Sequence, residues 1–183
     1  MKPFLSGIFL LFAFAHSSSC QTETSLKTHS TMSEQAEQHE KHAYYSRTDT
    51  NKLELADSVW KKILPEDLYE VARHAATERA FTGKYWDYEG NGTYYCAACG
   101  HALFKSDSKF ASGCGWPSFY ESIRENSVRY TSDTSYGMIR TEVLCGRCNA
   151  HLGHIFDDGP APTGKRFCMN SISLDFEPEK QSR

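Results

Sequence analysis

The stretch Cys96-Ala97-Ala98-Cys99 has a counterpart in Cys145-Gly146-Arg147-Cys148, and 45 residues lie between the two pairs. A Cys-x-x-Cys pair forms a short turn that aims two thiolates at one point, and two such pairs supply the four ligands of a tetrahedral zinc site. The spacing predicts one structural Zn²⁺ that clips two distant turns together. Two alternatives stay open: disulfide bonds, or a redox-active Cys-x-x-Cys motif.

The chain around these pairs has the composition of β-structure. Beyond Gly83 the residues Tyr, Phe, Thr, Ser and Val become frequent, and turn signals such as Glu89-Gly90-Asn91-Gly92 and Asp158-Gly159-Pro160 divide the sequence into short pieces. We expect a mainly β fold of antiparallel strands. The candidate strands are Thr93 to Cys96, Ser127 to Thr131, Ile139 to Leu144, and Arg166 to Phe176.

A short helical region is expected before the strands. Apolar residues recur at helical spacing in Leu68, Val71, Ala72 and Ala75, and two carboxylates follow Pro65 in the first turn. This pattern predicts one amphipathic helix from about Pro65 to Thr77.

Length and charge limit the architecture and the partners. The chain has 183 residues, a net charge of -3 and 39% hydrophobic residues, which suits one folded domain over residues 52–178 with a C-terminal tail over 179–183. No basic run is present, so a nucleic-acid partner is not expected. We expect a monomer that acts on a small or neutral group.

The first residues have the pattern of an export signal. A positive start and the apolar run from Gly7 to Ala15 predict a signal over residues 1–20, and hence a periplasmic, extracellular or lipid-anchored protein. Ala13-Phe14-Ala15 is one candidate cleavage site. The alternative is a lipoprotein signal ending at a lipidated Cys20, although Ser17 stands where leucine is usual.

Residues 21–51 are rich in Ser, Thr, Glu, Gln, His and Lys and contain almost no aliphatic side chains. Such a composition cannot bury enough apolar surface to offset the entropy lost on ordering. We therefore expect a flexible spacer, in which His39 and His42 are solvated.

Cys168 is the best candidate for a nucleophile. It lies in Arg166-Phe167-Cys168-Met169-Asn170 on an expected strand, where Arg166, Cys168 and Asn170 would share one face. A guanidinium beside a thiol favours the nucleophilic thiolate, and Asn170 offers a hydrogen-bonding group. The competing interpretation is that Cys168 is a small buried apolar residue.

Two further motifs favour a catalytic function. Cys114 lies between glycines, with Trp116 as a flat apolar wall nearby. His151 and His154 follow the second cysteine pair directly, and histidine is the usual proton donor near neutral pH. A second metal at His151 and His154 is the alternative, but no third ligand stands at a set spacing.

Together these motifs resemble the methionine sulfoxide reductases of the B type, which act on the R epimer of methionine sulfoxide. The resemblance covers about Pro65 to Phe176. It is carried by Phe81-Thr82-Gly83, Cys96-Ala97-Ala98-Cys99, Ser112 to Phe119, Cys145-Gly146-Arg147-Cys148, His151 to Pro160, and Arg166 to Asn170.

The resemblance implies two antiparallel β-sheets with a short N-terminal helical part, and zinc on the four paired cysteines. It implies that Cys168 attacks the sulfoxide sulfur and becomes a sulfenic acid, which Cys114 resolves to a disulfide that thioredoxin or a similar dithiol reduces. His151 and His154 are the candidate acids, with Arg166 and Asn170 beside them. Trp116, with Phe156 and Phe167, would hold the substrate's methyl group.

Two functions of other classes compete with this one. A non-catalytic zinc-stabilised β-module could bind a peptide or small ligand through its aromatic residues, but it would have no use for Cys168 and Cys114 together. A thiol-disulfide oxidoreductase would use one of the Cys-x-x-Cys pairs. Free methionine sulfoxide and oxidised proteins both remain candidate substrates.

Overall fold

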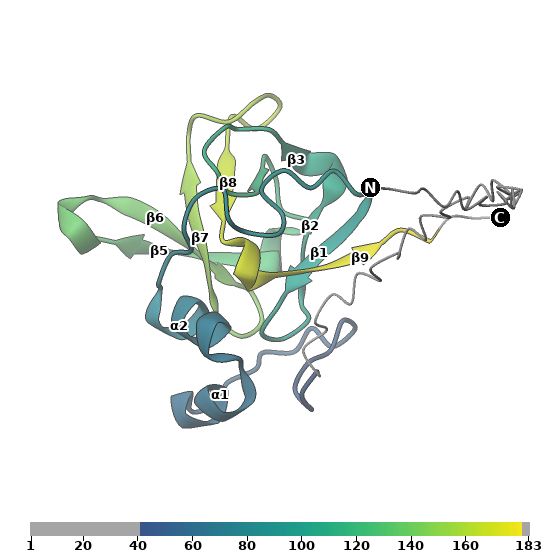
Figure 1. The fold of residues 1–183 in the computed structure, drawn as a ribbon, viewed down its shortest axis with the longest axis vertical. Coiled ribbons are helices and arrows are strands. Elements are labelled where there is room, and N and C mark those ends of the chain that lie inside the picture. Colours follow the sequence, from purple (N-terminus) through teal and green to yellow (C-terminus); the bar gives the residue numbers. More distant parts are fainter. Residues whose placement is uncertain (1–40, 181–183) are drawn as a thin grey trace, which may run out of the picture. The chain divides into compact units, whose positions relative to one another are not determined.

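The computed structural model describes residues 41–180, and the expected export signal, Cys20 and residues 21–40 of the expected spacer lie outside them. Two α-helices precede nine strands in two antiparallel sheets, which confirms the mainly β prediction (Figure 1). Over residues 41–180, no helix is long and apolar enough to cross a bilayer.

Both sheets are antiparallel throughout. The smaller sheet has the strand order β2-β1-β9 and the larger one β3-β4-β8-β7-β6-β5. The smaller sheet consists of β1 (Gly92–Cys96), β2 (Ala102–Lys105) and β9 (Leu174–Pro178). The larger sheet consists of β3 (Lys109–Phe110), β4 (Ser118–Phe119), β5 (Val128–Asp133), β6 (Arg140–Cys145), β7 (His151–Phe156) and β8 (Arg166–Met169). Four short 3-10 turns connect them: Ser106–Ser108, Glu125–Ser127, Ser135–Gly137 and Ser171–Ser173.

Aromatic side chains from both sheets form the centre of the core. Phe104 of β2 stacks on Phe119 of β4 with ring centroids 4.4 Å apart, and Tyr94 of β1 meets Phe119 edge-on at 5.0 Å. Phe167 of β8 closes the group against Phe104 at 5.6 Å. Each buried ring contributes roughly 2 to 3 kcal/mol, so these rings bind the two sheets to each other.

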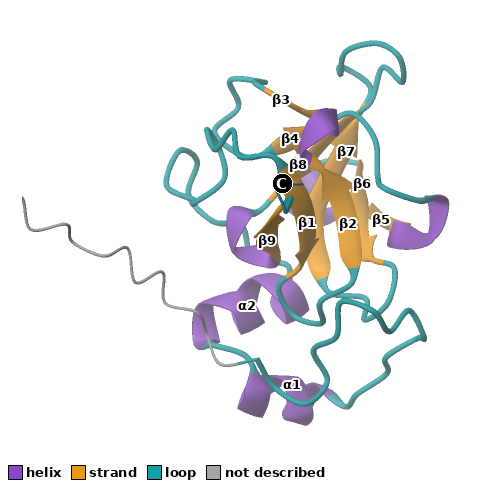
Figure 2. Ribbon diagram, turned by 90° about the vertical axis from the view of Figure 1, so that its right-hand side faces the viewer, coloured by secondary structure: helices purple, strands orange, loops and turns teal. Residues whose placement is uncertain are grey.

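The helical region consists of two short helices, α1 (Asp57–Ile63) and α2 (Glu66–His74), which lie at one end of the strands (Figure 2). The predicted helix is confirmed, but α2 ends before Thr77 because Ala75 adopts a left-handed conformation with φ 53°. The sequence pattern did not reveal α1. Only Trp60 of its seven residues is buried, so no apolar repeat marks it.

The strand predicted from Arg166 to Phe176 is wrong as one element. It breaks after Met169, makes the 3-10 turn Ser171–Ser173, and continues as β9 in the other sheet. The carboxylate of Glu78 accepts the backbone N–H groups of Ser171 and Ile172 at 2.5 and 3.1 Å. A side chain distant in sequence thus satisfies the donors that the break releases.

The expected spacer ends earlier than residue 51, because residues 41–53 pack on the domain as an N-terminal strap. His42 Nε2 lies 2.9 Å from the carbonyl oxygen of Ala98, so His42 is not a solvated tail histidine. Tyr45 and Arg47 both donate to the carboxylate of Asp175. Polar contacts hold most of this segment, which is why its lack of aliphatic residues was misleading.

Arg147 anchors the strap to the second cysteine pair. Its buried guanidinium donates to the carbonyl oxygens of Tyr44, Asn51 and Cys99 at 3.1, 3.2 and 2.7 Å, and to Asp49 Oδ2 at 2.7 Å. Among the described residues, this one side chain therefore joins both cysteine turns to the strap.

We predict that Arg147→Ala lowers the free energy of unfolding by about 3 kcal/mol, because it removes the four hydrogen bonds of a buried guanidinium, one of them to the carboxylate of Asp49. Arg129→Ala is the matched control. The side chain of Arg129 is exposed, and within residues 41–180 it donates a hydrogen bond only to Asn149 Oδ1. The control should change stability by less than about 0.5 kcal/mol. Urea unfolding monitored by tryptophan fluorescence measures both; equal effects would contradict the anchoring role.

Candidate active site and metal centre

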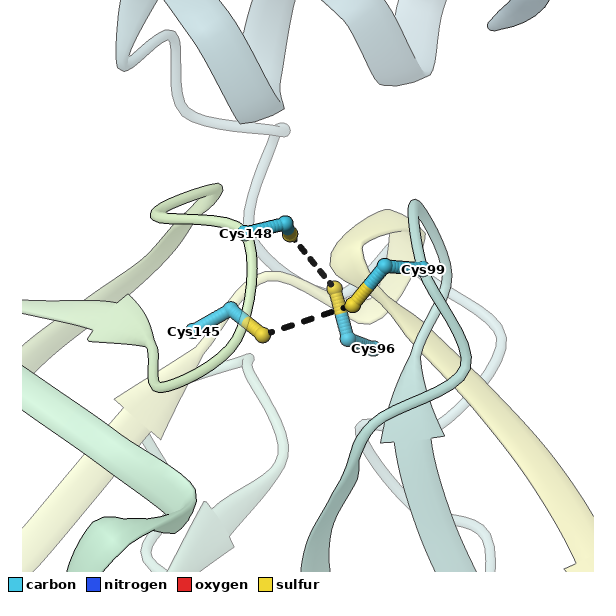
Figure 3. A group of neighbouring side chains, drawn as sticks. All are labelled: Cys96, Cys99, Cys145 and Cys148. Carbon is cyan, nitrogen blue, oxygen red and sulfur yellow. Dashed lines mark hydrogen bonds between the residues drawn. The ribbon is translucent and has the colours of Figure 1, made fainter. Parts of the chain in front are cut away.

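The four paired cysteines meet in one buried cluster. Cys96 ends β1 and Cys99 lies in the turn that follows, Cys145 ends β6 and Cys148 lies in the turn after it, and the sulfurs face one another (Figure 3). All four ligand atoms lie within 4.8 Å of one another. The pairs Cys96–Cys148 and Cys99–Cys145 have Sγ–Sγ distances of 3.8 and 3.6 Å.

These distances fit a tetrahedral metal ion. Four thiolates about 2.3 Å from a central ion lie roughly 3.8 Å from one another, whereas a disulfide needs about 2.05 Å. The four cysteines are free thiols and almost completely inaccessible. The cluster is therefore suited to a closed structural metal site, and it is poorly suited to exchange with an external disulfide.

A second group of side chains lies on one face of the larger sheet. Cys168 of β8 is directly opposite Ser118 of β4 on one side and His154 of β7 on the other. His154 in turn is opposite Glu142 of β6. Directly opposed residues in a sheet point to the same face, so four neighbouring strands place these polar side chains in one row.

A bulge in β7 adds His151 to this face. Residues three apart on a regular strand point to opposite faces, but the β6–β7 register shifts so that Leu152 has no partner, and the His151 and His154 rings come within 5.5 Å. Gly153 permits the bulge. Its φ is 154°, and a Cβ there would lie 2.1 Å from the carbonyl oxygen of Cys168.

Each histidine is paired with a carboxylate that the sequence patterns did not identify. His151 donates from Nδ1 to Glu142 at 2.6 Å, and His154 from Nε2 to Asp133 at 2.7 Å. Burial lowers the pKa of His151 even though Glu142 raises it. The His154 side chain is more accessible, 12% against 3%, and it lies directly opposite Cys168.

The two remaining thiols in the described part of the chain face each other. Cys114, in the loop before β4, has its Sγ 3.5 Å from that of Cys168. Burial opposes ionisation of Cys114, but its hydrogen bonds with Ser112, Ser118, the backbone of Trp116 and Cys168 together outweigh burial and lower its pKa to about 7. Burial and the neighbouring Cys114 raise the pKa of Cys168 to about 12.

This charge distribution corrects one expectation. Arg166 does lower the pKa of Cys168, as expected, but burial and Cys114 have the larger effect. The Arg166 guanidinium forms two hydrogen bonds with Asp158, at 2.8 and 2.9 Å, and lies 4.4 Å above the ring of Phe156. Of the two thiols, Cys114 therefore has the lower pKa and Cys168 the higher one.

Phe167 and Phe156, both expected at the substrate site, lie on opposite faces of the sheet. Phe167 points to the opposite face from Cys168, into the core and toward a cavity of about 450 Å³ that Ile155 also lines. That position corrects its expected contact with a substrate on the Cys168 face. Phe156 does share the face with Arg166, to which it is directly opposed.

Asn170 lies beyond the end of β8, and its side chain forms hydrogen bonds with the protein backbone. Its Nδ2 donates to the carbonyl oxygen of Leu152 at 3.2 Å, and its Oδ1 accepts the N–H of Glu78 at 3.0 Å. The carbonyl oxygen of Glu78 accepts the indole N–H of Trp116 at 3.1 Å. Asn170 thus acts on the site through Glu78 and Trp116, a link between distant segments that sequence spacing does not reveal.

The chain is similar to proteins of one family. A family described as "SelR domain" matches residues 64–178. The "Peptide methionine sulfoxide reductase MsrB" of Thiobacillus denitrificans is 57% identical over 123 residues, which are 67% of this chain and 93% of that protein. The protein of the same name from Methanosarcina barkeri is 53% identical over 131 residues, 72% of this chain and 92% of that protein.

We predict that Cys114 is alkylated by iodoacetamide with a midpoint near pH 7 and that Cys168 reacts only at much higher pH. The thiolate is the reactive form. Because the pKa of Cys114 is lowered to about 7, about half of its side chains are thiolate at that pH and can react. Mass spectrometry of digested protein, alkylated for a short time at a series of pH values, measures each site. Earlier alkylation of Cys168 would contradict the assignment of charge.

Proposed function

The chain belongs to the SelR domain family, and from this membership we propose that it is a peptide-methionine (R)-S-oxide reductase. The observation that carries the proposal is the pair of thiols, Cys114 and Cys168, 3.5 Å apart beside two carboxylate-paired histidines. A thiol that accepts an oxygen atom and a second thiol that removes it are the two components that this reduction needs.

In the first step Cys168 attacks the sulfoxide sulfur. The oxygen passes from methionine sulfoxide to Cys168 and the thiol proton ends on that oxygen, so methionine leaves and Cys168 becomes a sulfenic acid. We assign His154 as the group that donates a hydrogen bond to the sulfoxide oxygen, from Nδ1 of the doubly protonated ring while Nε2–H stays on Asp133. Its place opposite Cys168 and its greater exposure support it over His151.

Trp116 is the proposed wall for the apolar methyl group of the substrate. The hydrogen bond from its indole N–H to Glu78 holds the ring in place. Trp116 also lines a hollow of about 340 Å³ together with Trp86 and Phe110. This hollow offers space for the residues that flank a methionine sulfoxide within a peptide.

In the second step Cys114 replaces the oxygen on Cys168. The S–O bond breaks, an S–S bond forms and water leaves, after which thioredoxin or a similar dithiol reduces the disulfide. We propose that Zn²⁺ occupies the four-cysteine cluster and stabilises the fold. Metal analysis finding about one zinc per chain supports this over a redox role for the Cys-x-x-Cys pairs, and a metal-free active protein would refute it.

We also propose that the protein is exported and works outside the cytoplasm, on the basis of the pattern in residues 1–20. The mass of the mature N-terminus distinguishes cleavage near Ala15 from lipidation of Cys20. An intact N-terminus at Met1 would refute export.

We predict that Cys168→Ser abolishes reduction of R-methionine sulfoxide with dithiothreitol, by at least about 100-fold, because a hydroxyl is a far weaker nucleophile than a thiol. S-methionine sulfoxide should be a poor substrate for both forms. Chromatographic assay of methionine measures the rates. Activity that survives the substitution would show that a group other than Cys168 attacks the sulfoxide.

We predict that Cys114→Ser retains turnover with dithiothreitol and loses most of it with thioredoxin. A small thiol reaches the sulfenic acid of Cys168 directly, whereas thioredoxin needs the disulfide that Cys114 forms. Steady-state rates with each reductant, measured side by side, provide the test. An equal loss with both reductants would show that Cys114 has no separate resolving role.

A further inference from the structure

Two serines surround the sulfur of Cys114. Ser112 Oγ lies 2.9 Å from Cys114 Sγ and 2.8 Å from Ser118 Oγ, while Ser118 Oγ lies 3.5 Å from Cys114 Sγ. Ser118 is completely buried and lies directly opposite Cys168 in the sheet. Both hydroxyls are therefore next to the pair of sulfurs that close the disulfide.

When Cys114 is a thiolate, the hydrogen-bond contacts allow one order for the two hydroxyl protons. Each hydroxyl can donate once and accept twice. In this order Ser112 Oγ accepts the backbone N–H of Cys114 at 3.4 Å and the hydroxyl proton of Ser118 at 2.8 Å, and donates its own proton to the sulfur of Cys114 at 2.9 Å. Donors linked in this way polarise one another and strengthen the last hydrogen bond in the series.

We propose that Ser112 and Ser118 are positioning residues that hold Cys114 in its charged, attacking form for closure of the disulfide with Cys168. The inference rests on the proposed function, which supplies the sulfenic acid on Cys168. Cys114 then forms the S–S bond, the S–O bond of Cys168 breaks, and the departing hydroxide takes up a proton to become water.

Ser118 has a second acceptor available when Cys114 is no longer a thiolate. Ser118 Oγ also lies 3.3 Å from the carbonyl oxygen of Trp116. When the sulfur of Cys114 is part of a disulfide, it no longer attracts the proton of Ser112 strongly, and Ser118 can donate to Trp116 instead. The serines therefore assist closure and lose their hold on the sulfur once closure is complete.

The charges that face Cys114 do not replace the serines. Cys168 lies 3.5 Å away, and Arg166 on the same strand acts on Cys114 at longer range while it is paired with Asp158. Within the described residues, Ser112 and Ser118 make the hydrogen bonds that most lower the pKa of Cys114. An attacking thiol is most effective when its pKa is near the ambient pH, and these two hydrogen bonds shift the pKa of Cys114 in that direction.

The test compares two rates within a single turnover. Reduced protein without free thiol is mixed with R-methionine sulfoxide and quenched in acid at set times. Chromatography then gives methionine formation, and the mass of the alkylated protein gives disulfide closure. In Ser112→Ala at pH 7, closure should slow about tenfold relative to methionine formation, because less Cys114 is thiolate. Ser112→Thr keeps the hydroxyl and should restore closure.

Ser118→Ala should slow closure less than Ser112→Ala, because it removes only the supporting donor. Ser122→Ala is the matched control, since Ser122 donates to the carbonyl oxygen of Arg124 away from the thiols. The alkylation midpoint of Cys114 should rise in Ser112→Ala, because the lost donor no longer stabilises the thiolate.

Disulfide closure at the wild-type rate in Ser112→Ala would overturn the inference. An equal fall in the rates of methionine formation and disulfide closure would also overturn it, because it would indicate a general structural role. The proposed function fails separately, if the Cys168→Ser protein still forms methionine. The two failures are therefore distinguishable in one series of measurements.

Discussion

The convergence of four thiols is the constraint on which the rest of the structure depends. Cys96 ends β1 in the smaller sheet and Cys145 ends β6 in the larger sheet, so the cluster joins the two sheets at one end. β7 begins three residues after Cys148, and its first residue is His151. An ion bound there would thus hold the start of the strand that carries both histidines.

The strap and the cluster support each other. Arg147 stands between two of the thiols in sequence and binds the carbonyl oxygens of the strap. The turn at Gly100 comes close to Ser46, since a Cβ at this glycine would lie 2.7 Å from the carbonyl oxygen of Ser46, and its φ is 79°. The strap lies outside the family match at 64–178, but it forms hydrogen bonds with the two turns that carry the four clustered cysteines.

The same two strands provide both the core and the chemistry. On β8, Phe167 and Met169 are buried while Cys168 between them faces the reactive side. On β7, a bulge at Leu152 brings two histidines to that side without removing Leu152 from the core. Strong packing on one face fixes side chains on the other to within the accuracy that a reaction between two sulfurs requires.

Much of this protein follows from local sequence. The cysteine spacing indicated the cluster, and the period of two along Arg166–Cys168 placed these residues on one face, because ligand spacing and strand alternation act over few residues. Other features were decided only by tertiary structure. The break after Met169, the strap over residues 41–53, and the carboxylate partners of His151 and His154 depend on hydrogen bonds between separate segments of the chain. Such contacts leave no period in the sequence, since each partner is chosen by the fold that brings it within reach.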